Sequence, residues 1–278
     1  MESGVGTRSL GEARRGGEAV ARSRTFELAA RGGFLARGAI YGIIGILAVK
    51  LAVGAGGKTT NQKGALETIA HQPFGRGLLI LTAFGLGGYA MWRFTRAVLG
   101  HGPEDTDTSF DRAAAVGSGL VYAALCALAV TIVIGSSGGT SGNTPKTTAG
   151  VLGWPGGVWL VGAAGVVLIG VGCYQGHRAV TQDFLEDSKT EEMGPLTRAW
   201  AGFIGTFGHL ARMVVFVLVG VFLIKAAVEF DPNKAVGLDG ALAKLARQPY
   251  GSFLLGIVAA GLVAFALYSI TDARYRRI

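Results

Sequence analysis

Long runs of apolar residues, separated by short polar segments, dominate the chain after its polar N-terminal segment. Six of these runs are about 20 residues long, which is the length that an α-helix needs to cross the hydrocarbon core of a bilayer. Transmembrane β-strands would instead show about ten residues of alternating polarity, and the runs do not alternate in this way. The predicted spans are residues 34–54, 77–99, 113–134, 157–175, 210–230 and 250–271. We therefore expect an all-α, polytopic membrane protein with six transmembrane helices.

Composition supports lipid as the surrounding solvent. Half of the residues are hydrophobic and 16% are charged, whereas soluble domains usually carry about 25% charged residues. The 46 glycines, many of them inside the spans, favour close approach of neighbouring helices. Two cysteines are too few for a disulfide scaffold.

The net charge is +8, and the positions of the basic residues along the chain are more informative than the total. In a soluble domain such an excess would suggest nucleic acid. Here the basic residues gather at the ends of apolar runs, so we expect no nucleic-acid partner and instead expect contact with anionic lipid. Most Lys and Arg residues fall on the side that carries both termini, which predicts that both termini are cytoplasmic.

An internal repeat organises the spans. The segment GALETIAHQPFGRGLLILTAFGLGGYA at 64–90 matches GALAKLARQPYGSFLLGIVAAGLVAFA at 240–266. Each begins with a predicted short amphipathic helix that ends at Gln-Pro. A weaker middle copy has Trp154-Pro155-Gly156 in place of the QPFG motif, and we expect it to lack the short helix. Because each copy contains two spans, all copies insert in one direction, which predicts three helical hairpins with pseudo-threefold symmetry about the membrane normal.

The repeat also predicts the domain boundaries. The expected parts are a largely disordered cytoplasmic tail (1–27), module 1 (28–100), module 2 (110–184), a cytoplasmic linker (185–203) and module 3 (204–278).

The segment ARGGFLARGAIYGIIGILAVKLA at 30–52, followed by GALETIAHQPFGRGLLILTAFGLGGYAMWRFTRA at 64–97, resembles the bacterial membrane family of domain of unknown function 1206. The resemblance covers about residues 28–278. It implies two-span modules, commonly three in one chain, in the bacterial cytoplasmic (inner) membrane. It implies no activity, substrate or catalytic residue.

Five arginines lie near the predicted cytoplasmic ends of at least four spans. Because the guanidinium group matches the geometry of phosphate, they are candidates for binding anionic lipid or a phosphorylated ligand. Setting the topology and contacting lipid headgroups is the simpler interpretation of the same residues. These arginines are Arg37, Arg93, Arg96, Arg178 and Arg212.

Two lysines form a second candidate site, near the ends of spans on the side of the membrane opposite the arginines. A charge within hydrocarbon is costly unless it snorkels or is paired, and it can mark a polar cavity. Lys225 precedes Glu229 by one helical turn and could pair with it, whereas the matching position after Lys50 is Gly54. Snorkelling to the interface is the simpler alternative for both lysines.

No metal-ligand cluster, cofactor motif or catalytic constellation is apparent in the sequence, so we expect no cofactor, no metal and no enzymatic activity. The leading functional hypothesis is a structural, interaction or lipid-binding membrane module. Its partners would be anionic lipids, a membrane protein or a second copy of the chain. The alternative is a channel or transporter for a small ion or solute.

Overall fold

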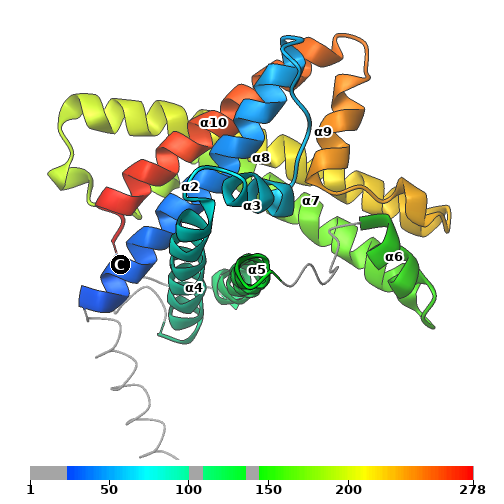
Figure 1. The fold of residues 1–278 in the computed structure, drawn as a ribbon, viewed down its shortest axis with the longest axis horizontal. Helices are drawn as coiled ribbons and strands as arrows, with labels where there is room; N and C mark the ends of the chain where they lie inside the picture. The colour runs from blue at the N-terminus through cyan, green and yellow to red at the C-terminus, as the bar shows by residue number, and fades with distance from the viewer. Residues whose placement is uncertain (1–23, 100–108, 136–143, 278) are drawn as a thin grey trace, which may run out of the picture.

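The computed structural model describes residues 24–99, 109–135 and 144–277 (Figure 1). Its long helices are α2 (Arg24–Ala52), α4 (Gly75–Leu99), α5 (Ser109–Val133), α7 (Gly157–Thr181), α8 (Pro195–Val228) and α10 (Gly251–Tyr275). Its short elements are the α-helices α3 (Gln62–Ala70), α6 (Thr144–Leu152) and α9 (Leu238–Ala246), and the 3₁₀ turns η1 (Asp183–Leu185), η2 (Thr190–Glu192) and η3 (Pro232–Lys234). The expected all-α fold is confirmed.

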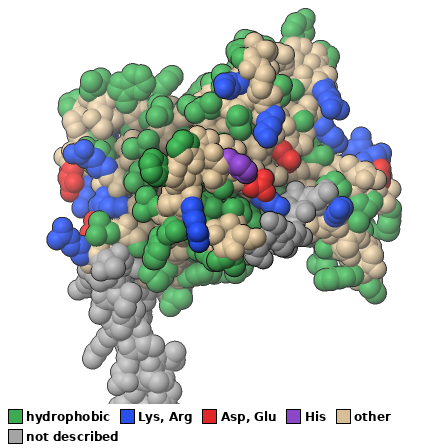
Figure 2. Space-filling view, viewed as in Figure 1, with side chains coloured by type: hydrophobic (Ala, Val, Ile, Leu, Met, Phe, Trp, Pro, Cys, Tyr) green, Lys and Arg blue, Asp and Glu red, His purple; other side chains and the backbone are tan. Residues whose placement is uncertain are grey.

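Each long helix is long and apolar enough to span a membrane. A 25-residue helix measures about 37 Å, which exceeds the roughly 30 Å of a hydrocarbon core. Side chains in the middle of these helices face outward: Leu81, Phe84 and Val167 are 71%, 76% and 62% exposed. Hydrophobic side chains also cover much of the face in Figure 2. Such a surface suits lipid, because soluble proteins rarely expose large apolar patches.

The helices extend beyond several predicted bounds. Helix α8 begins at Pro195, a residue suited to the first turn of a helix, so the second half of the predicted 185–203 linker is helical. Helix α10 continues past the predicted end at residue 271 to Tyr275 and so includes Asp272. Helix α2 begins at Arg24, inside the predicted 1–27 tail, while residues 1–23 of that tail lie outside the described residues.

The long helices pack as a series in the order α5, α4, α2, α10, α8, α7 (Figure 1). In this series the second helix of each module contacts the first helix of the next module: α4 packs on α5, α7 on α8, and α10 on α2. Modules 1 and 3 also pack as hairpins. Within the described residues, however, α5 and α7 make no extensive contact, so module 2 spans the two ends of the series. The pseudo-threefold axis remains a prediction.

Glycines allow the closest helix contacts. A Cβ atom at Gly165 of α7 would lie 2.7 Å from the carbonyl oxygen of Gly220 on α8, and one at Gly220 would lie 2.6 Å from the oxygen of Gly165. A Cβ atom at Gly33 of α2 would lie 2.6 Å from the oxygen of Gly85 on α4. These backbones therefore touch at distances that only glycine permits, as expected where packing drives helix association.

Each second span begins at a turn that follows a short helix. Helices α3 and α9 are confirmed, but the expectation that the middle copy lacks a short helix is wrong, because α6 occupies that position. Thr144-Pro145 supplies a helix start there without resembling the GAL sequence of the other copies. At the turn, Phe74, Gly156 and Tyr250 adopt left-handed backbone angles (φ 60°, 80° and 58°). This conformation costs a non-glycine residue about 1–2 kcal/mol.

Candidate functional site: a buried arginine cluster

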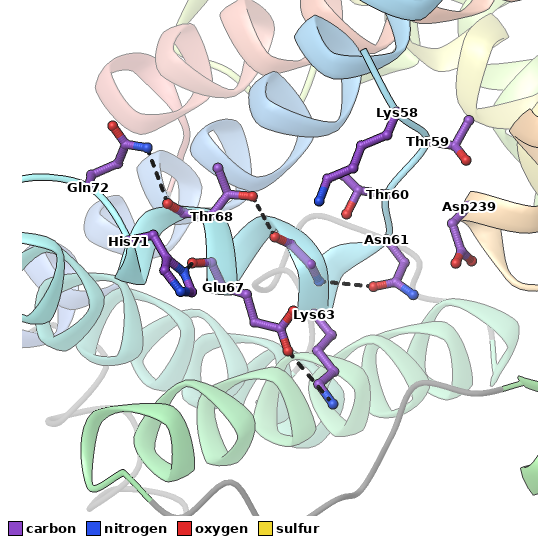
Figure 3. A pocket seen from close by; sticks show the side chains of 11 residues that line it. Lys58, Thr59, Thr60, Asn61, Lys63, Glu67, Thr68, His71, Gln72 and Asp239 are labelled. Atoms are coloured by element: carbon purple, nitrogen blue, oxygen red, sulfur yellow. Dashed lines mark hydrogen bonds and ion pairs between the residues drawn. The ribbon is translucent and has the colours of Figure 1, made fainter. Parts of the chain in front are cut away.

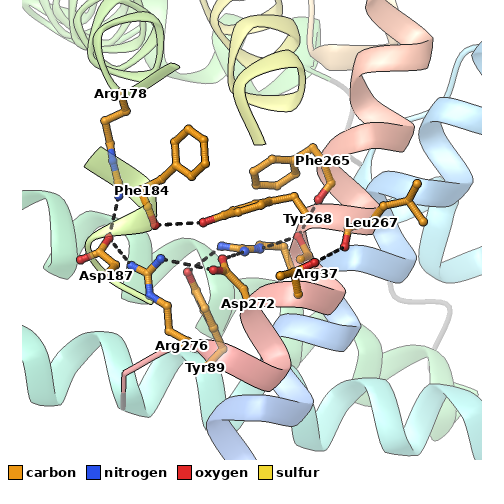
Figure 4. A network of polar contacts seen from close by, with 12 residues as sticks. Arg37, Tyr89, Arg178, Phe184, Asp187, Phe265, Leu267, Tyr268, Asp272 and Arg276 are labelled. Carbon is orange, nitrogen blue, oxygen red and sulfur yellow. Dashed lines mark hydrogen bonds and ion pairs between the residues drawn. The ribbon is translucent and has the colours of Figure 1, made fainter. Parts of the chain in front are cut away.

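An ion pair between Arg37 and Asp272 joins the first and third modules (Figure 4). Arg37 lies on α2 and is 6% exposed, and Asp272 lies on α10 and is 1% exposed. The Nη2 atom of Arg37 donates to Oδ2 of Asp272 at 2.7 Å, and Nε donates to Oγ of Ser269 at 3.2 Å. Because a buried charge is costly without a partner, this pair fixes α2 against α10.

The hydroxyl oxygen of Tyr89 on α4 accepts hydrogen bonds from two arginines. Arg37 donates through Nη1 at 3.1 Å, and Arg93 donates through Nε at 3.1 Å and Nη2 at 2.9 Å. The Tyr89 ring packs edge-on against Phe34 and lies 4.4 Å, between centroids, from the ring of Tyr122 on α5. Tyr89 thus ties the Arg37–Asp272 pair to α4 and α5.

A second carboxylate, Asp187, lies in the connection between α7 and α8. Its Oδ2 atom accepts from Arg178 and from Arg276, both at 2.6 Å, and Arg96 lies 3.8 Å from its Oδ1 atom. Burial alone would raise the pKa of an aspartate, but Arg276, Arg178 and Arg96 hold the pKa of the Asp187 carboxyl well below its usual range. Asp187 therefore remains charged and connects α4, α7 and the C-terminus.

The backbone around Asp187 is held against the C-terminal end of α10. Ser188 and Arg276 form an antiparallel bridge. The Lys189 amide donates to the Tyr275 carbonyl at 2.7 Å, and the Arg277 amide donates to the Asp187 carbonyl at 3.0 Å. These bonds explain why a loop carboxylate can meet arginines from three parts of the chain.

Arg212 on α8 reaches the same region by a different route. In the amide orientation that satisfies both groups, the Gln175 oxygen accepts from Arg212 at 2.8 and 3.1 Å. The Arg212 guanidinium also lies 4.4 Å from the centroid of Phe265, a ring that Arg37 approaches at 5.0 Å. The Phe265 ring therefore makes cation–π contacts with both Arg37 and Arg212. Each of the five predicted arginines contacts Tyr89, Asp187 or Phe265.

We name this set the arginine cluster, and among the described residues its positive charge exceeds its negative charge. Its arginines are Arg37, Arg93, Arg96, Arg178, Arg212 and Arg276, and in the described part of the chain the carboxylates that pair with them are Asp187 and Asp272. The cluster is also not fully enclosed, since the side chains of Arg96 and Arg178 are 14% and 17% exposed. A partly desolvated surplus of guanidinium groups is suited to attracting an anion.

Sequence reasoning missed the acidic half of this cluster. The predicted sixth span ends at residue 271, one residue before Asp272, and Asp187 falls in the predicted cytoplasmic linker (185–203). Extending the repeat alignment past Ala90 and Ala266 would have paired Arg96 with Asp272. This reversal of charge at equivalent positions is the signal that could have found the ion pair.

The predicted lysine candidates lie toward the opposite ends of their helices. Lys50 is exposed, and the Lys225 side chain is 54% exposed. Lys225 lies 3.8 Å from Glu229, which also pairs closely with Lys234. The predicted Lys225–Glu229 pair is thus present, and the polar-cavity role of these residues remains a prediction.

A polar groove of about 760 Å³ lies beside α3 (Figure 3). It is lined by the segment from Lys58 to Asn61, by the polar side of α3 with Glu67, by His71 just after α3, and by Asp239 at the start of α9. Lys63 pairs with Glu67 at 3.8 Å along the helix. Among the residues that the structure describes, no group of three or more His, Cys, Asp or Glu side chains could hold a metal ion.

Comparison with known proteins agrees with the repeat. The family model described as Domain of Unknown Function (DUF1206) matches the chain three times, at residues 32–100, 113–182 and 207–276. A protein of Bacillus subtilis (strain 168), "Uncharacterized protein YxxB", is 35% identical over 250 residues, which cover 88% of this chain and 90% of that protein. No solved structure matches the chain significantly. The chain therefore belongs to the DUF1206 family, with three tandem copies of its two-span module.

Proposed function

We propose that this multi-pass protein is a non-catalytic structural module of the bacterial cytoplasmic membrane, which retains anionic phospholipid at the arginine cluster. The observation that carries the proposal is the charge balance of that cluster, in which six arginines meet two aspartates among the described residues. A phosphodiester would supply the missing negative charge. Both termini then lie in the cytoplasm, on the side where basic residues favour anionic lipid.

Arg93 and Arg96 are the residues best placed to bind the phosphate. Arg93 donates to the neutral hydroxyl of Tyr89, and Arg96 shares Asp187 with two closer arginines. Both guanidinium groups lie about 5 Å from the centroid of the Trp92 ring. Counted over the described residues, the donors of Arg93 and Arg96 outnumber their acceptors. In a site of reduced dielectric, a charge-assisted hydrogen bond contributes about 1.5–3 kcal/mol.

Native mass spectrometry of the full chain, extracted with its lipids, tests the proposal. We expect R93Q/R96Q to lower the retention of phosphatidylglycerol on the order of tenfold, since about 1.4 kcal/mol corresponds to that factor. The matched control is R112Q/R198Q, which removes the same charge from two exposed arginines near the starts of α5 and α8. Equal lipid retention in both double variants would contradict the proposal.

A further inference from the structure

Two large aromatic side chains are exposed at the strained turns that begin the second spans of modules 1 and 3. Phe74 is 92% exposed and Tyr250 is 86% exposed. Each precedes the glycine that begins a second span, and each follows a proline. Both have the left-handed backbone that favours glycine (φ 60° and 58°). The exposed ring and the left-handed backbone are therefore each unfavourable for a non-glycine residue in water.

The middle module shows that an aromatic residue is not needed to make this turn. Gly156 occupies the equivalent left-handed position, with φ 80°. Exposed tryptophans nevertheless lie on both sides of it: Trp154, in the turn, is 64% exposed, and Trp159, in the first turn of α7, is 84% exposed. All three modules thus present exposed aromatic rings where their second span begins, although only two of them place the ring at the strained position.

The next residue explains why the turn itself is fixed. A Cβ atom at Gly75 would lie 2.2 Å from the carbonyl oxygen of Ala70, and one at Gly251 would lie 2.3 Å from that of Ala246. The chain therefore turns sharply between the short helix and the span. This turn sets the direction in which the ring of the preceding residue projects.

The positions of Phe74 and Tyr250 at the ends of spans indicate which region of the bilayer surrounds their rings. Helices α4 and α10 have 25 residues each, or about 37 Å, so their ends extend past a hydrocarbon core of roughly 30 Å. Phe74 and Tyr250 stand at the N-terminal ends, opposite the arginine cluster at the C-terminal ends. Aromatic rings prefer the headgroup level of a bilayer, where an apolar body and a polar edge are both accommodated.

We propose that Phe74, Tyr250 and the tryptophan pair Trp154 and Trp159 form an aromatic anchor, which inserts into the phospholipid headgroup region on the membrane face opposite the arginine cluster. The anchor would fix the depth of the short helices α3, α6 and α9 on that face. This proposal is independent of lipid binding by the arginines.

The test uses tryptophan fluorescence of the full chain in phosphatidylcholine vesicles. The four native tryptophans are replaced by Phe, and F74W supplies the probe. We expect stronger quenching by lipid brominated near the carbonyl end of its chains than by lipid brominated near the methyl end. The control F84W, at an exposed position nearer the middle of the same span, should show the reverse order. Quenching of F74W mainly by the deep bromines, or by neither lipid, would overturn the proposal.

A second measurement keeps the test available if the probe chain does not fold. In the native background, F74L and F74W are compared by unfolding in lipid nanodiscs. Because tryptophan prefers the headgroup level and leucine the hydrocarbon, F74W should keep at least a threefold higher ratio of folded to unfolded protein than F74L. Equal ratios, or a higher ratio for F74L, would show that the ring does not lie at the headgroup level.

Discussion

Arg37 and Asp272 are separated by 235 positions in the chain, yet their side chains are 2.7 Å apart in the interior of the protein. The pair joins the first helix of module 1 to the last helix of module 3. The repeated modules are therefore joined by a specific polar contact as well as by apolar packing. Asp272 also accepts from Arg276, at 3.5 Å, and Arg276 donates to Asp187, so Arg276 connects the two carboxylates of the arginine cluster.

Removing one member of this pair should lower the free energy of unfolding much more than removing both. We expect D272N to lower the free energy of unfolding by about 3–5 kcal/mol, because it leaves Arg37 buried without its counter-charge. The double variant R37M/D272L should recover at least half of that loss. Unfolding in mixed micelles measures both, and a D272N protein as stable as the native chain would contradict this role.

The hydroxyl of Tyr89 should matter more than that of its neighbour Tyr122. We expect Y89F to cost about 1–3 kcal/mol, because Arg37 and Arg93 lose a shared acceptor. The rings of Tyr89 and Tyr122 pack together, so Y122F is a matched control with an expected effect below about 0.5 kcal/mol. Similar losses in the two variants would mean that the Tyr89 hydroxyl has no special role as the shared acceptor of Arg37 and Arg93.

The lowered pKa of Asp187 predicts that the free energy of unfolding depends on pH. Its folded-state pKa is lowered, so the unfolded chain binds its proton more readily. The stabilisation should be complete above about pH 4, the ordinary pKa of an aspartate, and should be lost as the pH falls toward the folded-state pKa. The difference in Tm between the native chain and D187N should therefore be largest near neutral pH and shrink below pH 4. A difference that stays constant with pH would refute this assignment.

The glycine contacts predict opposite effects for two substitutions on one helix. G165A would place a Cβ atom 2.7 Å from the Gly220 oxygen, and we expect it to lower stability by about 2 kcal/mol or more. A Cβ atom at Gly170 meets nothing within 4 Å, so G170A should be neutral or stabilising by up to about 1 kcal/mol. Thermal unfolding in detergent compares them, and equal losses would indicate that α7 and α8 are not packed at Gly165.

The spans and the modules could be predicted because a bilayer imposes a simple requirement on helix length and polarity. The C-terminal end of α10 could not be predicted, because Asp272 looks like the polar end of a span until its buried partner Arg37 is known. The starting point of α8 at Pro195 is similar, since its first turns contain polar residues that hydropathy assigns to a linker. The separation of α5 from α7 depends on tertiary packing, which a local repeat does not encode.

The arginines were predicted as a group because positive charge near span ends is visible in sequence. Their partners were missed because Asp187 reaches the cluster only through the backbone bonds that join its loop to Tyr275 and Arg277. Such a long-range backbone contact leaves no periodic pattern. Pairing of charges across the repeat, as between Arg96 and Asp272, is the sequence signal that remains usable.

The most direct measurement is a crystal structure grown in a lipid phase that contains phosphatidylglycerol. We predict a phosphate group within about 3 Å of the guanidinium nitrogens of Arg93 or Arg96, on the open side of the arginine cluster. Guanidinium groups that contact only protein acceptors, in a crystal with ordered phosphatidylglycerol elsewhere on the protein, would contradict the account.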